Sequence, residues 1–101
     1  MAEFINPFSG VCPDRKMTKR EVVRAIRLSL SAEQEAVHLY KAIADATDDP
    51  LVKDVMEDIA DEERVHAGEF QRLLKILLPD EEKLLAEGAE EVDEMAEKLK
   101  K

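Results

Sequence analysis

Two long segments of the chain carry apolar residues at alternating steps of three and four. This period is typical of the buried stripe of an α-helix. The stripe of the first segment consists of Val23, Ile26, Leu30, Val37, Tyr40, Ala44 and Thr47, and that of the second of Val52, Met56, Ile59, Phe70, Leu73 and Leu77. The pattern therefore predicts two long amphipathic helices, and these two stripes are called the first and second seams below.

Local signals mark where the two helices begin and end. Thr18 and Glu21 have the spacing of a capping box directly before the first seam, which predicts a helix from Thr18 to about Thr47. Asp49 suits an N-cap and Pro50 the first position of a second helix, which ends at about Leu78. Because the break between the helices is short, we expect residues 18–78 to form an antiparallel hairpin.

The segments that flank this hairpin differ in composition. Residues 1–17 contain closely spaced turn formers and predict an irregular N-terminal extension. Residues 79–101 are acidic and predict a shorter C-terminal helix with apolar residues at a 3.5-residue spacing, although Gly88 weakens the case for a continuous one. The fold class predicted is all-α: a two-helix hairpin that dimerises into a four-helix bundle, plus this helix.

Three ionisable residues interrupt the two seams. Glu33 falls in the first seam, and Glu63 and His66 fall in the second. Charged groups are seldom buried without a partner or a metal, because their desolvation is costly. Glu33 lies about 15 residues before the turn and the other two about 15 and 18 after it, so a rise of ~1.5 Å per residue brings all three to one level.

This set of side chains suits a transition metal. Glu63 and His66 form Glu-x-x-His, which places a carboxylate and an imidazole on one helix face. Ferritin-like di-iron bundles use two Glu helices and two Glu-x-x-His helices. One chain supplies half of that set, so a two-fold dimer would complete it. The alternative is an ion pair between the helices that fixes their register.

Composition excludes several other classes of function. Hydrophobic residues make up 45% and charged residues 39% of the 101 residues, and the net charge is −9. That acidity disfavours a nucleic-acid partner and favours cations. The chain has one cysteine, Cys12, which excludes a disulfide framework and a four-cysteine metal site within the chain. Neither a signal peptide nor an apolar run of about 18 residues is present, so we expect no membrane contact and a cytoplasmic location.

Residues 31–40 (SAEQEAVHLY) and 61–70 (DEERVHAGEF) resemble the encapsulated ferritin family. The resemblance implies a ferroxidase that oxidises Fe(II) with O2 or peroxide at a di-iron centre shared by two subunits. It also implies a larger ring such as a decamer, held inside an encapsulin nanocompartment or fused to the shell protein, where the iron is mineralised and stored. By matching position, it implies that Glu33, Glu63 and His66 are iron ligands, that Glu63 bridges the irons, and that Tyr40 lies beside the centre.

Two other functions remain open from the sequence. One is a rubrerythrin-like peroxide reductase, although a single cysteine cannot build the four-cysteine iron site of full rubrerythrins. The other is a helical dimerisation module without a metal. Glu35 and His38 repeat the Glu-x-x-His spacing on the face opposite the first seam, where we expect solvated surface. The same reading applies to Glu57, Glu62 and Glu69.

Overall fold

The computed structural model describes residues 15–100, and within them the protein is built from three helices without a strand. These helices are α1 (Lys19–Ala46), α2 (Pro50–Leu77) and α3 (Pro79–Leu99). The predicted all-α class and all three predicted helices are confirmed. Cys12 and most of the predicted N-terminal extension lie outside the described residues. No helix in residues 15–100 combines the length and the apolar character that crossing a membrane requires.

The capping box fixes the start of α1. The Thr18 hydroxyl accepts a hydrogen bond from the Glu21 backbone N–H at 3.2 Å, and the Glu21 carboxylate accepts one from the Thr18 N–H at 3.0 Å. Arg15 donates two further hydrogen bonds to this carboxylate, at 2.7 and 2.9 Å. The guanidinium and the Thr18 N–H together lower the pKa of Glu21 to about 2.

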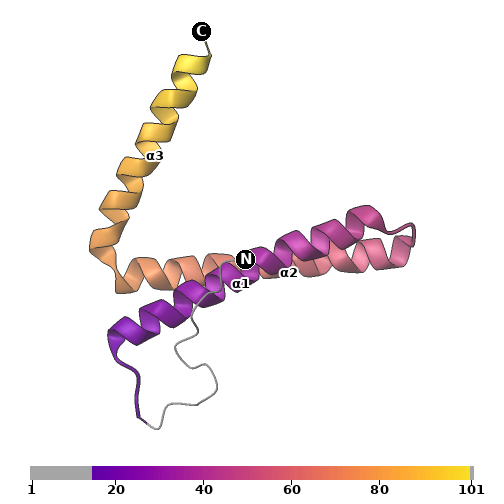
Figure 1. Cartoon of the computed structure of the whole chain (residues 1–101), viewed down its shortest axis with the longest axis horizontal. Helices are drawn as coiled ribbons and strands as arrows, with labels where there is room; N and C mark the ends of the chain where they lie inside the picture. The colour runs from indigo at the N-terminus through magenta and orange to yellow at the C-terminus, as the bar shows by residue number, and fades with distance from the viewer. Residues whose placement is uncertain (1–14, 101) are drawn as a thin grey trace, which may run out of the picture.

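The turn between α1 and α2 is equally well defined. The Asp49 carboxylate accepts hydrogen bonds from the N–H groups of Leu51 and Val52 at 2.9 and 3.3 Å, and Pro50 occupies the first position of α2. Because the break is short, α2 returns alongside α1 as an antiparallel partner (Figure 1). The two helices form the hairpin that the seams predict.

The hairpin has a thin core. Within the described residues, Ala44 and Ala60 are the only buried hydrophobic side chains, and larger seam residues such as Val37 and Phe70 are only half-buried. Other large apolar side chains, including Leu39 and Val65, are mostly exposed. A pair of helices can cover only one side of each helix, so much apolar surface is left for contacts with other chains.

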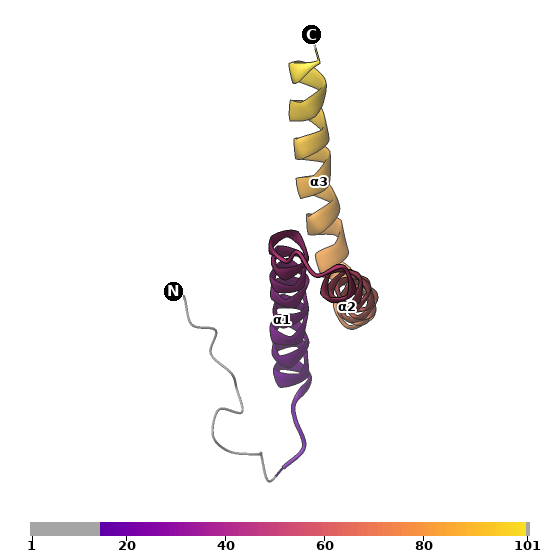
Figure 2. The same ribbon diagram turned by 90° about the vertical axis from the view of Figure 1, so that its right-hand side faces the viewer.

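Helix α3 leaves the hairpin at a steep angle (Figures 1 and 2). Leu78 ends α2 and also precedes α3, and Pro79 prevents one continuous helix through this point. Two ion pairs tie the base of α3 to the hairpin, one between Arg27 and Glu81 and one between Lys75 and Glu82 at 3.1 Å. Beyond this elbow α3 is a single helix that continues through position 88 without a break.

Candidate metal centre

Glu33, Glu63 and His66 meet between α1 and α2. One potential ligand atom from each residue lies within 4.8 Å of the other two. Within residues 15–100, this is the one group of three potential metal ligands. Atoms bound to one ion at about 2.1 Å lie at most about 4.2 Å apart, so small side-chain rotations would close the group around a metal.

The hairpin brings these residues together for a simple geometric reason. Glu33 precedes the turn by about as many residues as Glu63 follows it, and both helices rise by ~1.5 Å per residue. His66 is three residues after Glu63, so both side chains project from the same side of α2. The capped turn at Asp49 therefore sets the register that aligns the three candidate ligands.

The Glu33 carboxylate is left without a hydrogen-bond partner on its buried oxygen. Its Oε2 is buried and accepts no hydrogen bond from residues 15–100, although His66 Nδ1 lies 3.8 Å away. The Nδ1 atom is also 3.7 Å from Glu63 Oε2. Both distances exceed the 2.7–3.2 Å range of N–H···O hydrogen bonds. A buried acceptor without a partner is costly, and a cation placed among these three atoms would satisfy it.

The group opens to one side of the hairpin. The carboxylate side chains are 22% and 20% exposed, whereas that of His66 is 51% exposed. At helical spacing, Ile59 and Phe70 share the face of His66 and are half-buried. Three donors from one chain would leave coordination positions of a bound ion open on this side.

The remaining candidate residues lie apart from this group. Tyr40 is half-buried two turns after Glu33, and no hydrogen bond within residues 15–100 joins its hydroxyl to the three ligands. Glu35 and His38 are exposed, and they belong to no three-residue metal group in that part of the chain. Glu62 and Glu69 are exposed, and Glu57 forms an ion pair with Lys41 at 3.5 Å.

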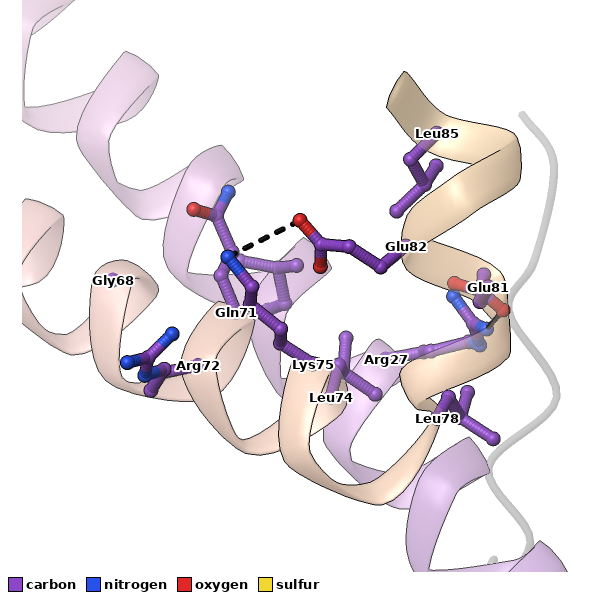
Figure 3. A pocket seen from close by; sticks show the side chains of 11 residues that line it. Arg27, Gly68, Gln71, Arg72, Leu74, Lys75, Leu78, Glu81, Glu82 and Leu85 are labelled. Atoms are coloured by element: carbon purple, nitrogen blue, oxygen red, sulfur yellow. Dashed lines mark hydrogen bonds and ion pairs between the residues drawn. The ribbon is translucent and has the colours of Figure 1, made fainter. Parts of the chain in front are cut away.

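An open groove of about 560 Å³ lies at the elbow between the hairpin and α3 (Figure 3). Arg27 of α1, Gln71 and Lys75 of α2, and Glu82 of α3 are among its lining residues, and none of the three candidate ligands lines it. The ion pair between Arg27 and Glu81 could not be predicted, because no local pattern links Arg27 to a residue 54 positions later. The groove is therefore formed where α3 meets the hairpin, and it is separate from the three candidate ligands.

Comparison with known proteins identifies the family. The model of the rubrerythrin family matches residues 25–101, which include most of α1 and the whole of α2 and α3. The chain belongs to the rubrerythrin family of ferritin-like proteins.

Relatives within this family are linked to encapsulins. The chain is 45% identical over 76 residues to the encapsulin nanocompartment cargo protein EncC of Myxococcus xanthus, covering 75% of this chain and 58% of that protein. It is 39% identical over 91 residues to the ferritin-like–encapsulin shell fusion protein of Pyrococcus furiosus, covering 90% of this chain and 26% of that protein. The chain thus spans only part of both curated relatives.

A solved structure supports the same placement. The crystal structure of the encapsulated ferritin domain from Pyrococcus furiosus is 39% identical, with a TM-score of 0.80 over 89% of this chain and 91% of that one. The predicted resemblance to encapsulated ferritins is therefore confirmed. Rubrerythrin-family proteins of the ferritin-like kind typically bind iron, and the Glu33, Glu63 and His66 group has the donor set for it.

Proposed function

We propose that this protein is a ferroxidase that oxidises Fe(II) at a centre completed by two copies of the chain. The observation that carries the proposal is the group of two carboxylates and one imidazole, with a buried carboxylate oxygen that no donor in the described part of the chain satisfies. His66 Nδ1 lies 3.8 Å from that oxygen, which is within ion-pair distance but too long for a hydrogen bond.

A second copy would supply what one chain lacks. A two-fold pair joined over the exposed side of His66 brings together four carboxylates and two imidazoles, the set used by ferritin-like di-iron proteins. The four carboxylate charges repel each other in the absence of cations, and two Fe(II) ions would neutralise them. Metal and pairing should therefore favour each other by mass action.

In the reaction, Fe(II) is the substrate. Two Fe(II) ions give up two electrons, which reduce O2 to H2O2 with the uptake of two protons, or H2O2 to two molecules of water. The carboxylates of Glu33 and Glu63 would hold the ions, and the imidazole of His66 would complete the donor set. Tyr40 stands on the same helix as Glu33 and is proposed to lie beside the centre. The half-buried Ile59 and Phe70 limit the access of water.

The relatives suggest where this reaction takes place. Two of them are named as an encapsulin cargo protein and as a fusion with an encapsulin shell. We therefore include in the proposal an assembly into a ring such as a decamer, enclosed in an encapsulin nanocompartment in the cytoplasm, where Fe(III) is mineralised.

The test compares two Glu-x-x-His pairs of the same chain. Glu63→Ala and His66→Ala should each lower the initial rate of Fe(III) formation by at least about tenfold, since even indirect partners of metal ligands cost that much. Glu35→Ala and His38→Ala are the matched controls, because they remove the same chemistry from the exposed face. Equal rates in all four variants would refute the centre, and loss of activity in the control pair alone would place it on the other face.

A further inference from the structure

The surface where α1 begins contains an uncovered apolar groove. The start of α1 lies beside the end of α2 (Figure 1), and a groove of about 400 Å³ is lined there by Val23 of α1 and by Leu78. Lys19 and Arg20 complete its lining, which is almost entirely apolar because long cationic side chains cover such surface with their alkyl stems. An uncovered groove of this kind marks a contact surface.

Cations border this groove. A second groove of about 620 Å³ shares Arg20 and Val23 with it and adds Arg24. Glu21 also lines the second groove, but Arg15 already binds its carboxylate at 2.7 Å. Among residues 15–100, Arg20 and Arg24 form no ion pair, so this surface is positive although the net charge of the chain is −9. The α1 entry face, as the two grooves together are called below, consists of Lys19, Arg20, Val23, Arg24 and Leu78.

The segment that precedes the described part of the chain has the composition that complements this face. Residues 1–14 contain two of the three phenylalanines of the chain, and they contain no lysine or arginine. An apolar and weakly acidic segment matches a groove that is apolar inside and cationic at its border. The large apolar residues of the segment are Phe4, Ile5, Phe8 and Val11, and its acidic residues are Glu3 and Asp14.

The segment is also tied next to the α1 entry face. Arg15 follows it directly, and the Arg15 guanidinium donates two hydrogen bonds to Glu21 in the first turn of α1, at 2.7 and 2.9 Å. Phe8 lies seven positions before Arg15, and seven residues span up to roughly 23–25 Å. The first two turns of α1 rise over only ~11 Å, so Phe8 can reach the groove. Covalent attachment gives the segment an effective concentration in the millimolar range, which favours it over a separate partner.

We propose that residues 1–14 dock on the α1 entry face of the same chain, with Phe8 in the apolar groove and the carboxylates of the segment towards Arg20 and Arg24. This contact covers the end of the hairpin opposite the turn at Asp49. None of its residues belongs to the candidate metal centre, so it requires neither a metal nor a second copy. Another acidic partner can use the α1 entry face only after the segment is released.

The test uses the full chain, in the presence of a chelator, with a fluorescent reporter. The chain has no tryptophan, so Phe8→Trp introduces a single indole at the position that the proposal buries. Its emission should be blue-shifted relative to that of a synthetic peptide of residues 1–14 with the same substitution. Quenching by acrylamide should be at least about twofold weaker than in the peptide if about half or more of the molecules are docked. Neither quantity should change with protein concentration, because the contact lies within one chain.

The apolar side of the contact is tested from within the segment. Phe4→Ser with Ile5→Ser, made in the Phe8→Trp protein, should shift the emission to that of the free peptide, because the segment loses most of its apolar surface. Both positions lie outside the three helices, so the hairpin should stay folded. Circular dichroism checks the helix content of each variant.

The cationic border is tested by charge reversal. Arg20→Glu with Arg24→Glu should lower the ratio of docked to free segment by roughly threefold to tenfold, as expected for exposed charges. The control, Lys53→Glu with Lys98→Glu, makes the same change in net charge near the start of α2 and in the last turn of α3. It should leave the emission unchanged.

Three results would overturn the proposal. Emission and quenching equal to those of the free peptide would mean that the segment is not docked. Emission that depends on protein concentration would assign the contact to a second copy of the chain. Emission that is blue-shifted but unchanged by both the serine and the charge-reversal substitutions would place the indole on a different surface.

Discussion

Replacing Glu33 with methionine should stabilise the metal-free protein while removing its response to metal. Methionine has a similar length and no acceptor to satisfy. Glu33 Oε2 is buried without a hydrogen bond, and the side chain as a whole is 22% exposed. A buried carboxylate that serves to bind an ion lowers the stability of the folded protein whenever the ion is absent.

The magnitude follows from two opposing contributions. A buried acceptor without a partner costs about 1–3 kcal/mol. The variant also loses the contact between Glu33 and His66, which lowers its stability. Because the two groups are 3.8 Å apart and the imidazole is half-exposed, this contact contributes under about 1 kcal/mol. The variant should therefore gain roughly 1 kcal/mol, which raises the Tm of a domain of this size by about 4–8 °C.

Equilibrium urea unfolding at one fixed protein concentration, with chelator and then with a divalent transition metal, measures both effects. Wild type should gain about 2.7 kcal/mol at a metal concentration of 100 times Kd, and Glu33→Met should gain little. The reasoning is refuted if Glu33→Met is less stable than wild type in chelator by more than about 1 kcal/mol. That result would mean that Glu33 and His66 form a structural ion pair.

Three further predictions concern the helix starts and the fate of the iron. The folded-state pKa of Glu21 is lowered from 4.5 to about 2, so its contribution to stability is present above about pH 4.5 and is lost as the pH falls towards 2. The free energy of unfolding of wild type and of Glu21→Gln, measured across this pH range, should differ by this loss. Identical pH profiles of the two proteins would contradict it. Asp49→Ala removes the N-cap of α2 and should lower the free energy of unfolding by about 1 kcal/mol, as measured by chemical denaturation. The control Asp48→Ala changes a neighbouring residue that is not the N-cap, and it should have little effect. Finally, an open assembly of hairpins has no closed interior, so a large aerobic excess of Fe(II) should be oxidised quickly and then precipitate; a soluble iron core that co-elutes with the protein on gel filtration would show that the subunits form a cage.

Local signals made the hairpin predictable from the sequence. Thr18 with Glu21, and Asp49 with Pro50, are short-range capping patterns, and the structure begins both helices where they indicate. The level of the three ligands followed from counting residues on each side of the turn. Regular helices make that count reliable, since the rise per residue is fixed.

The direction of α3 could not be predicted in the same way. Leu78 and Pro79 show that a helix ends, but a break of this kind does not determine where the next helix points. The observed direction is accompanied by ion pairs of Glu81 with Arg27 and of Glu82 with Lys75, and the first of these joins residues far apart in the sequence. The helical spacing of the apolar residues on α3 was visible in the sequence, but the exposure of Leu85, Val92 and Met95 became clear only from the structure.

The proposed division of the ligand set between two identical chains would have a genetic consequence. A centre that draws Glu33, Glu63 and His66 from each of two copies is intact only when both copies are intact. In a cell that makes equal amounts of normal chain and of His66→Ala chain, random pairing leaves about one quarter of the centres with a full set. The mutated half of the chains would thus remove more than half of the intact centres, and such an allele would behave as partly dominant.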